Sequence, residues 1–482
     1  MKPRPAVVTI LGHVDHGKTT LLDFIRKSGI ASKEHGGITQ RIGAYEVTTG
    51  IPVYRTDRIT FIDTPGHEAF SKLRARGANV SDLAILIIDA KDSVMPQTEE
   101  SIAHIKSAGI PFVVALNKTD LPDANPDKVK NDLLKYQVMT EGKGGDVPVA
   151  EISAKTGKGV PELLETLLLM AEDMKLEYDE KAPAEAYVVE TKKDNRGVVV
   201  SVIVRNGTIS VGDVVFAGHE KAKIRSLVSD IGTSLRSVTP SSPAEILGFN
   251  TAPEVGTKIA AVEIHAETIK TEPEAAKPFN MQEFLKPTVA ERVLSLVVKT
   301  DSQGSLEAIK HVLSQKENIK IILISVGHVN KSDVFLAKTT KAIVIGFAVN
   351  VSRDITDLAK QEKVIIKTYN IIYDLLDELQ EVADLLTEKE NQEKHIKGEA
   401  SIAAEFIIEG EKISGMKVTK GKINLSDEVE VFRGDNLIGT AKVVSIKMRA
   451  KPVSEVKKNQ EAGMILSSKL DFHVGDVIKS IS

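Results

Sequence analysis

A phosphate-binding loop near the N-terminus constrains this sequence more than any other feature. The apolar run Val7–Leu11 predicts a buried strand, and it leads into the spacing Gly12-x-x-x-x-Gly17-Lys18-Thr19, after which a helical pattern begins. The two glycines allow successive backbone N–H groups to converge on an anion, and the following helix directs the positive end of its dipole to the same place. Lys18 is expected to reach the β- and γ-phosphates of a nucleotide, and the hydroxyl of Thr19 is expected to ligate Mg²⁺.

A second predicted strand ends in Asp63, followed by Gly66 and His67. Asp63 is expected near Mg²⁺ through a water molecule, and the N–H of Gly66 near the γ-phosphate. Thr39 lies between the two phosphate motifs and could ligate Mg²⁺ while the γ-phosphate is present, which makes its segment either a switch or an ordinary surface loop. His67 is a candidate for orienting the attacking water, the alternative being an exposed loop histidine. The residues expected at the phosphates are Gly12, His13, Val14, Asp15, His16, Gly17, Lys18, Thr19, Thr20 and Gly66.

A third predicted strand, Phe112–Asn117, carries the residues that would select the base. It ends in Asn-Lys-x-Asp, and the carboxylate of Asp120 can accept hydrogen bonds from N1–H and the exocyclic amine of guanine. Adenine offers neither in that arrangement, so the carboxylate would lose both partners. The N–H of Ala154 could meet guanine O6. Each motif alone is weak, but their order along the chain predicts GTP. The expected guanine-binding residues are Asn117, Lys118, Asp120, Ser153, Ala154 and Lys155.

Composition excludes several other classes of protein. No apolar run approaches the roughly 20 residues that span a bilayer. The chain has no cysteine, which excludes disulfides and thiolate metal sites and suits the cytoplasm; its start also shows no signal peptide. A net charge of −4 argues against a uniformly basic nucleic-acid-binding protein, and 4% aromatic residues make base-stacking platforms improbable.

With 482 residues, the chain should hold about three or four domains. Short alternating strands follow the nucleotide domain, and the stretch Val202–Val215 is echoed by Met416–Val429, which suggests two barrels of one kind. Between them, strands alternate with helices, and the glycine-free stretch Ile371–His395 predicts a long helix. The expected fold is multidomain α/β and β, with a P-loop GTPase domain at 1–180, a β-barrel at 181–266, a linker at 267–288, an α/β/α sandwich domain at 289–370, a connecting helix at 371–397 and a C-terminal β-barrel at 398–482.

The nucleotide motifs resemble those of the translational GTPases. The resemblance rests on His-Val-Asp-His inside the loop, Gly-Ile-Thr ending at Thr39, and Asp-Thr-Pro-Gly-His ending at His67. It implies that His67 is catalytic, that Val14 and Ile38 form an apolar gate around the water, and that Thr39 binds Mg²⁺. It also implies that GTP hydrolysis is fast only on the ribosome.

The stretches "SQGSLEAI", "VGHVNKSDVFLA", "IGFAV" and "IIYDLLDEL" are similar to the third domain and connecting helix of bacterial translation initiation factor 2. That resemblance implies a cytoplasmic factor, monomeric off the ribosome and without a membrane partner. It would bring formylmethionyl initiator tRNA to the small ribosomal subunit and promote joining of the large subunit. Members usually carry a long N-terminal region that is not in this sequence.

The terminal barrel departs from the pattern of this family. Two cysteines usual beside the formylmethionyl group are replaced by Met416 and Ala462, and an expected arginine is displaced to Arg449. The pocket residues implied by the resemblance are Met416, Arg449, Glu461, Ala462 and Gly463. Two other functions stay open at this point. One is an elongation-type or tRNA-delivery GTPase, whose barrels would pack directly together, and the other is a regulatory GTPase that acts away from the ribosome.

Overall fold

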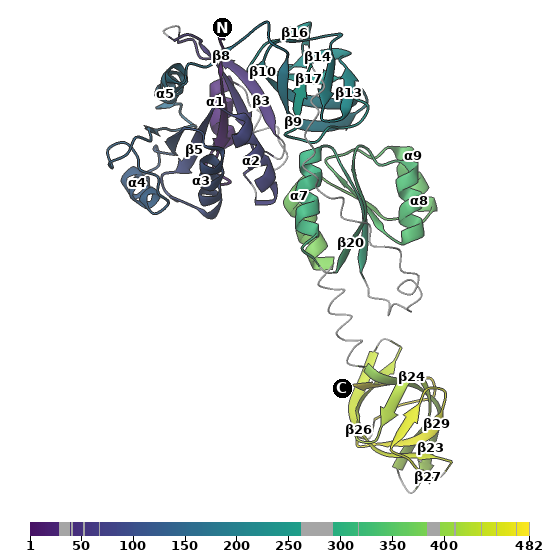
Figure 1. Ribbon diagram of the computed structural model, residues 1–482. Coiled ribbons are helices and arrows are strands. Elements are labelled where there is room, and N and C mark those ends of the chain that lie inside the picture. The colour runs from purple at the N-terminus through teal and green to yellow at the C-terminus, as the bar shows by residue number, and fades with distance from the viewer. Residues whose placement is uncertain are drawn as a thin grey trace. The chain divides into compact units, whose positions relative to one another are not determined.

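The computed structural model describes residues 1–27, 39, 42–51, 54–66, 68–261, 293–316, 318–382, 396–408, 411–434, 436–449, 451–468 and 470–481 (Figure 1). The described chain divides into two compact units, one extending to Glu378 and the other beginning at Leu379. No helix among these residues is long and apolar enough to cross a membrane. The two units are described separately below.

The first unit begins with a six-stranded sheet of order β3-β4-β2-β5-β6-β7, parallel throughout except for the pair β3–β4. Helices cover both faces, which explains why its central strands are apolar without alternation. Helices α1 and α5 pack on one face through Leu21 and Leu163, and α2, α3 and α4 pack on the other through Ala78, Ile102 and Val129. The elements are β1 (Lys2–Pro3), β2 (Ala6–Leu11), α1 (Lys18–Arg26), β3 (Gly43–Thr48), β4 (Arg58–Asp63), η2 (Glu68–Phe70), α2 (Ser71–Val80), β5 (Leu83–Asp89), α3 (Pro96–Ala108), β6 (Phe112–Asn117), α4 (Pro126–Leu134), β7 (Val149–Glu151), α5 (Val160–Asp173) and β8 (Glu177–Tyr178).

An antiparallel sheet of order β13-β12-β18-β9-β10-β17-β14-β15 follows in the same unit. Its inward-facing valines, leucines and isoleucines form one core, as the alternating sequence pattern predicts for a barrel. The strands are β9 (Glu185–Asp194), β10 (Gly197–Asn206), β11 (Ile209–Ser210), β12 (Val214–Ala217), β13 (Glu220–Lys223), β14 (Ser226–Ser229), β15 (Ser234–Leu235), β16 (Ser237–Val238), β17 (Pro243–Leu247) and β18 (Lys258–Ala260).

A four-stranded parallel sheet of order β20-β19-β21-β22 completes the first unit. Helices α8 and α9 share a core with one face, and α7 lies on the opposite face (Figure 1). The elements are β19 (Leu294–Thr300), α7 (Gln303–Leu313), β20 (Ile319–Val326), α8 (Lys331–Thr340), β21 (Ile343–Phe347), α9 (Arg353–Gln361) and β22 (Ile366–Tyr369). The chain is helical again at 372–382, where this described stretch ends.

The second unit is a closed antiparallel barrel. Its order β23-β30-β25-β26-β29-β24 returns to the start because β24 also pairs with β23. The strands are β23 (Ile396–Ile408), β24 (Glu411–Asn424), β25 (Glu428–Arg433), β26 (Asn436–Met448), β27 (Lys451–Pro452), β28 (Glu455–Lys457), β29 (Glu461–Leu466) and β30 (Val477–Ile481).

The two β-domains share one local structure. In the first, the N–H of Ser210 donates to the carboxylate of Asp213 at 2.7 Å; in the terminal barrel, the N–H of Asn424 donates to that of Asp427 at 2.8 Å. Both turns also follow a glycine with φ near 60°, Gly207 and Gly421. The sequence repeat therefore corresponds to a repeated turn.

The predicted fold class is confirmed: an α/β nucleotide domain, a barrel, an α/β/α domain and a terminal barrel. The domain boundaries themselves stay predictions. The proposed linker at 267–288 lies outside the described residues, as does the second half of the proposed long helix.

A buried carboxylate joins the nucleotide domain to the first barrel. Asp82 accepts two hydrogen bonds from Arg4, each 2.7 Å, and two from Arg205 of β10, 3.0 and 2.8 Å long. Burial alone would raise the pKa of Asp82, but the two guanidinium groups hold it below its usual range. One buried carboxylate therefore bridges an arginine of the nucleotide domain and an arginine of the barrel.

A second buried carboxylate links the barrel to the α/β/α domain. Glu190 of β9 is 4% exposed, and its Oε1 accepts from the N–H of Gly304, in the first turn of α7, at 3.2 Å. Burial raises the pKa of Glu190 to about 7, and nearby Asp301 adds to the shift. A Cβ on residue 304 would lie 2.7 Å from Glu190 Oε2, so only glycine allows this close approach.

Glu190→Gln should stabilise the protein above neutral pH. Because the folded chain holds this proton more tightly than the unfolded chain, the contribution of Glu190 to stability falls as pH rises from about 4.5 to about 7. The amide keeps the acceptor for Gly304 without the charge, so the gain at pH 8 should approach about 3 kcal/mol. Urea unfolding of the variant and the wild type at pH 5 and pH 8 measures this difference in the free energy of unfolding.

The matched control is Glu185→Gln on the same strand, where the carboxylate is 40% exposed and pairs with Lys258. This change should move the free energy of unfolding by less than about 1 kcal/mol. A Glu190→Gln protein no more stable than the wild type at pH 8 would contradict the argument.

Candidate functional site

The predicted phosphate loop runs from β2 into α1, and its glycines are required where the chain turns. Gly12 has φ 152° and Gly17 has φ 95°. A Cβ at Gly12 would lie 2.4 Å from the carbonyl oxygen of Ile87, and one at Gly17 would lie 2.3 Å from the Asn117 amide nitrogen. Both positions therefore exclude any larger residue.

Lys18 lies buried inside this loop. Its Nζ donates to the carbonyl oxygens of Gly12 and His13 at 2.9 and 2.6 Å. Burial lowers the pKa of Lys18 to about 8, partly offset by the attraction of Asp63. A buried ammonium group that has lost its hydration would be stabilised by an anionic ligand.

His16 cannot serve as a charged phosphate ligand. Its side chain is 1% exposed, and burial lowers its pKa to about 4, with His13 and Lys18 adding to the shift. The imidazole is therefore neutral at neutral pH, so His16 could contact a phosphate only through a neutral ring N–H or through its backbone.

Thr19, Thr39 and Asp63 meet beside Lys18. The hydroxyls of the two threonines are 2.7 Å apart, and the hydroxyl of Thr39 donates to Asp63 Oδ2 at 3.3 Å. Two hydroxyls and a carboxylate are an oxygen-only donor set, which fits Mg²⁺. These residues come from three separate segments, so the structure brings together the three predicted metal ligands.

The turn at residues 63–66, which we call the Asp-x-x-Gly turn, lies against the same loop. A Cβ on Gly66 would lie 2.5 Å from Lys18 Nζ and 3.1 Å from Val14 Cγ2. Gly66 and Val14 are therefore neighbours, and their roles as a phosphate contact and one side of a gate stay predictions. The other gate residue, Ile38, and the candidate catalytic residue His67 lie outside the described residues.

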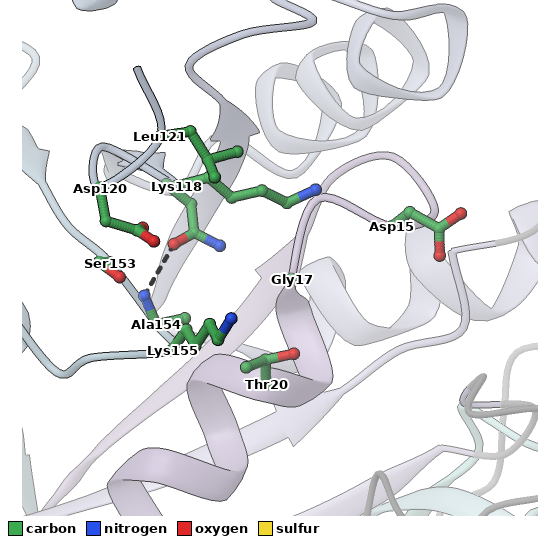
Figure 2. A pocket seen from close by; sticks show the side chains of 10 residues that line it. Asp15, Gly17, Thr20, Lys118, Asp120, Leu121, Ser153, Ala154 and Lys155 are labelled. Atoms are coloured by element: carbon green, nitrogen blue, oxygen red, sulfur yellow. Dashed lines mark hydrogen bonds between the residues drawn. The ribbon is translucent and has the colours of Figure 1, made fainter. Parts of the chain in front are cut away.

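A pocket of about 400 Å³ opens beside the loop (Figure 2). Asn117 is part of its lining: its amide nitrogen donates to the carbonyl of His16 at 2.8 Å, and its amide oxygen accepts from the N–H of Ala154 at 2.8 Å. In Figure 2, Asp120, Ser153 and Ala154 gather at one end, while Asp15 lies at the other. The pocket is lined by Asp15, Gly17, Thr20, Asn117, Lys118, Asp120, Leu121, Ser153, Ala154 and Lys155.

All six predicted guanine-binding residues line this pocket, and Asp120 is exposed at its rim. Lys118, at φ 60°, pairs with Asp89 at 2.7 Å. Burial alone would raise the pKa of Asp89, but the hydrogen bonds from Lys118 and from the N–H of Lys91 lower it. The ion pair holds the Lys118 side chain along one wall of the pocket.

Comparisons with known proteins agree with this geometry. Residues 4–173 match the family model of the elongation factor Tu GTP binding domain, residues 183–262 match elongation factor G domain 2, and residues 270–380 match translation-initiation factor 2. Translation initiation factor IF-2 of Thermus thermophilus is 41% identical over 99% of this chain, which covers 86% of that protein. The chain belongs to the translation initiation factor IF-2 family.

Other IF-2 relatives are considerably longer than this chain. The chain is 40% identical to IF-2 of Bartonella bacilliformis over 99% of its own length and 58% of that protein. It is 41% identical to IF-2 of Rhodopseudomonas palustris over 99% of its length and 56% of the relative. The crystal structure of GDP-bound aIF5B from Aeropyrum pernix is 27% identical, with a TM-score of 0.47 over 100% of this chain and 92% of that one.

The residues implied for the IF-2 initiator-tRNA pocket lie in the terminal barrel. Met416 pairs with Ala462 across β24 and β29, and both side chains are in the barrel core, 1% and 8% exposed. Glu461 and Arg449 are exposed, and Glu461 pairs with Lys417 at 3.6 Å. The two residues that replace cysteines thus pack inward, while the charged members face solvent; their role in tRNA binding stays a prediction.

Sequence reasoning missed several residues at the IF-2 nucleotide site. Gln97 accepts the N–H of Val14 at 2.9 Å, Arg74 binds the Asp-x-x-Gly turn, and Leu121 lines the pocket. Leu121 follows Asp120 directly and could have been found by extending the base motif. Gln97 and Arg74 act across the fold, and no local pattern marks them.

Proposed function

We propose that this protein is a GTP-dependent translation initiation factor. It binds GTP, promotes binding of formylmethionyl initiator tRNA to the small ribosomal subunit, and promotes joining of the large subunit. GTP hydrolysis, stimulated by the ribosome, times its release. The observation that carries the proposal is the convergence of Asn117, Asp120 and Ala154 on one pocket beside the phosphate loop, in a chain of the IF-2 family.

The guanine base would occupy the end of the pocket that Figure 2 shows around Asp120 and Ala154. Asp120 would accept from N1–H and the exocyclic amine, and the N–H of Ala154 would donate to O6. The Asn117 amide binds Ala154 and the phosphate loop at the same time. The groups that would bind the base and those that would bind the phosphates are therefore fixed relative to each other.

The phosphates would lie over the loop that contains Lys18. Its ammonium group can exchange a carbonyl partner for β- and γ-phosphate oxygens, which neutralises charge as the γ-phosphoryl group is transferred. Thr19 and Thr39, with Asp63 through water, would hold Mg²⁺, which supplies further neutralisation of the phosphate oxygens.

In the hydrolysis step, a water oxygen bonds to the γ-phosphorus while the bond from that phosphorus to the bridging oxygen breaks. The protons of the water pass to phosphate oxygens or to solvent, and the products are GDP and inorganic phosphate. We assign orientation of this water to His67 and its shielding to Val14 and Ile38, on the family resemblance. The terminal barrel would bind the formylmethionyl end of the tRNA through the pocket that includes Met416 and Glu461.

The alternative of an elongation-type GTPase is less well supported. Such a factor would follow its first barrel directly with a second, whereas here a parallel sheet of four strands with helices on both faces follows. That domain overlaps the match to translation-initiation factor 2 at 270–380.

The test measures GTP hydrolysis by the full chain with small subunits, large subunits or both, with and without initiator tRNA. We expect slow hydrolysis alone and strong stimulation when both subunits are present. Complex formation on small subunits should favour formylated initiator tRNA over elongator tRNA. Hydrolysis that ribosomes do not stimulate would contradict the proposal. Complex formation that is equally efficient with elongator tRNA and with formylated initiator tRNA would favour the delivery-factor alternative.

A further inference from the structure

A buried arginine binds the Asp-x-x-Gly turn from the side of α2. The guanidinium group of Arg74 is fully buried, and its Nη1 donates to the carbonyl oxygens of Pro65 and Gly66, each at 3.0 Å. Its Nη2 donates to Glu100 of α3 at 2.6 Å. One side chain of α2 thus binds two consecutive peptide groups of the turn and also the neighbouring helix α3.

Glu100 remains charged throughout the neutral range. Burial alone would raise its pKa, but hydrogen bonds from His104 and Ser71 and the attraction of Arg74 lower it to about 2. His104 Nε2 lies 3.1 Å from Glu100 Oε1. Both members of the ion pair are therefore charged at neutral pH, and moving Arg74 away from Glu100 would leave its buried guanidinium group without that counter-charge.

Planarity of the peptide bond connects this ion pair to the phosphate site. In a trans peptide the C=O and N–H groups point in opposite directions. The described chain has no cis peptides, so holding the carbonyl of Pro65 on the Arg74 side directs the N–H of Gly66 the other way. Gly66 itself lies against Lys18 Nζ. The bond from Arg74 thus fixes the direction of a donor beside the ammonium group of the loop.

The same helix also contacts the phosphate loop. Gln97 lies one turn before Glu100 on α3, and its Oε1 accepts the N–H of Val14 at 2.9 Å. Residues three apart share a helix face. One face of α3 therefore fixes both the loop, through Gln97, and the Asp-x-x-Gly turn, through Glu100 and Arg74.

We propose that Arg74 is a positioning residue for recognition of the γ-phosphate. Together with Glu100 it holds the Pro65–Gly66 peptide so that the N–H of Gly66 is directed at the third phosphate, and α3 keeps that peptide in register with the loop. The inference deepens the proposed function and rests on it. A residue that only stabilised the fold would affect GTP and GDP equally, whereas this role affects GTP alone.

The experiment compares Arg74→Lys with the wild type in the full chain. Lysine keeps the charge, but its three N–H donors share one nitrogen, so it lacks the two separate nitrogens with which Arg74 reaches the carbonyl groups and Glu100. We expect GDP affinity to stay within about twofold, the ratio of GTP to GDP affinity to fall about tenfold, as for loss of one aligned hydrogen bond, and ribosome-stimulated hydrolysis to fall about 10- to 100-fold. Fluorescent nucleotide titration and phosphate release measure these values.

Arg76→Lys is the matched control, because it makes the same change two residues along α2, where Arg76 pairs with Glu307 and does not bind the turn. It should leave the ratio of GTP to GDP affinity unchanged. If Arg74→Lys does not fold, Glu100→Gln serves instead, since it keeps the shape and removes the charge that holds Arg74. Glu100→Gln should also lower the ratio of GTP to GDP affinity, but by a smaller factor than Arg74→Lys.

Equal losses of GTP and GDP affinity, or an unchanged ratio in both Arg74→Lys and Glu100→Gln, would overturn the assignment. The ratio is measured without ribosomes, so it tests this inference separately from the proposed function. If wild-type hydrolysis were insensitive to ribosomes, the proposed function would fail, while the affinity ratio would still decide the role of Arg74.

Discussion

Asp120→Asn should change the base that the protein selects from guanine to xanthine. The carboxylate can accept two hydrogen bonds from guanine, and hydrogen bonds to a charged group contribute about 1.5–3 kcal/mol each. Asparagine loses the bond to the exocyclic amine, where two donors would face each other, and its bond to N1–H is no longer to a charged group, so GTP binding should weaken by about 10²–10⁴-fold. An asparagine can still accept from N1–H, and its amide can donate to the 2-oxo group of xanthosine triphosphate, which should then bind better than GTP.

Competition between the two nucleotides for the full chain measures this change. The control is Asp127→Asn, an exposed residue of α4 outside the lining of the pocket, which should leave the preference for GTP intact. If Asp120→Asn kept the wild-type preference, the base would not be read at this end of the pocket.

Asp82→Ala should destabilise the first unit by about 3–5 kcal/mol, the range for removing one partner of a buried ion pair. The substitution leaves Arg4 and Arg205 close together without the shared carboxylate. It also removes the acceptor for the N–H of Val7, at the start of the strand that leads into the phosphate loop. Urea unfolding at pH 7 measures the loss.

The control for this substitution is Asp194→Ala, because the Asp194 carboxylate also pairs with an arginine, Arg196, but is 34% exposed. A partly exposed pair should cost about 1 kcal/mol or less. A similar small loss for Asp82→Ala would show that the two buried arginines find other partners, and that the carboxylate does not hold the two domains together.

Local motifs made the nucleotide site predictable. Each predicted residue, such as Lys18 or Asn117, lies in a short stretch whose spacing follows from the geometry of a strand, a turn and a helix. The structure brings the described members together in one place, including Thr19, Thr39 and Asp63 from three segments. The order of motifs along the chain was enough to predict that these residues lie close together, because the carboxyl ends of parallel strands meet at one edge of a sheet.

Contacts between distant segments could not be predicted in the same way. Arg74 and Glu100 are ordinary charged residues of two helical patterns, and only the packing of α2 on α3 brings them together. Glu190 lies in an alternating strand, and its burial depends on a domain that begins about a hundred residues later. The inward packing of Met416 and Ala462 was also not evident, since their assignment came from a family pattern and not from the register of β24 and β29.

Closure of the terminal barrel has a consequence for how this part of the protein can meet other molecules. Because its ring of strands returns from β24 to β23, the ring offers no continuous free edge to which another chain could add a strand. Any ligand of this barrel must therefore be recognised by side chains and turns. The first β-domain ends instead in β13 and β15, of four and two residues, which are too short to template extended pairing. Both arrangements protect the two β-domains against edge-to-edge association with other chains during synthesis, before any partner is present.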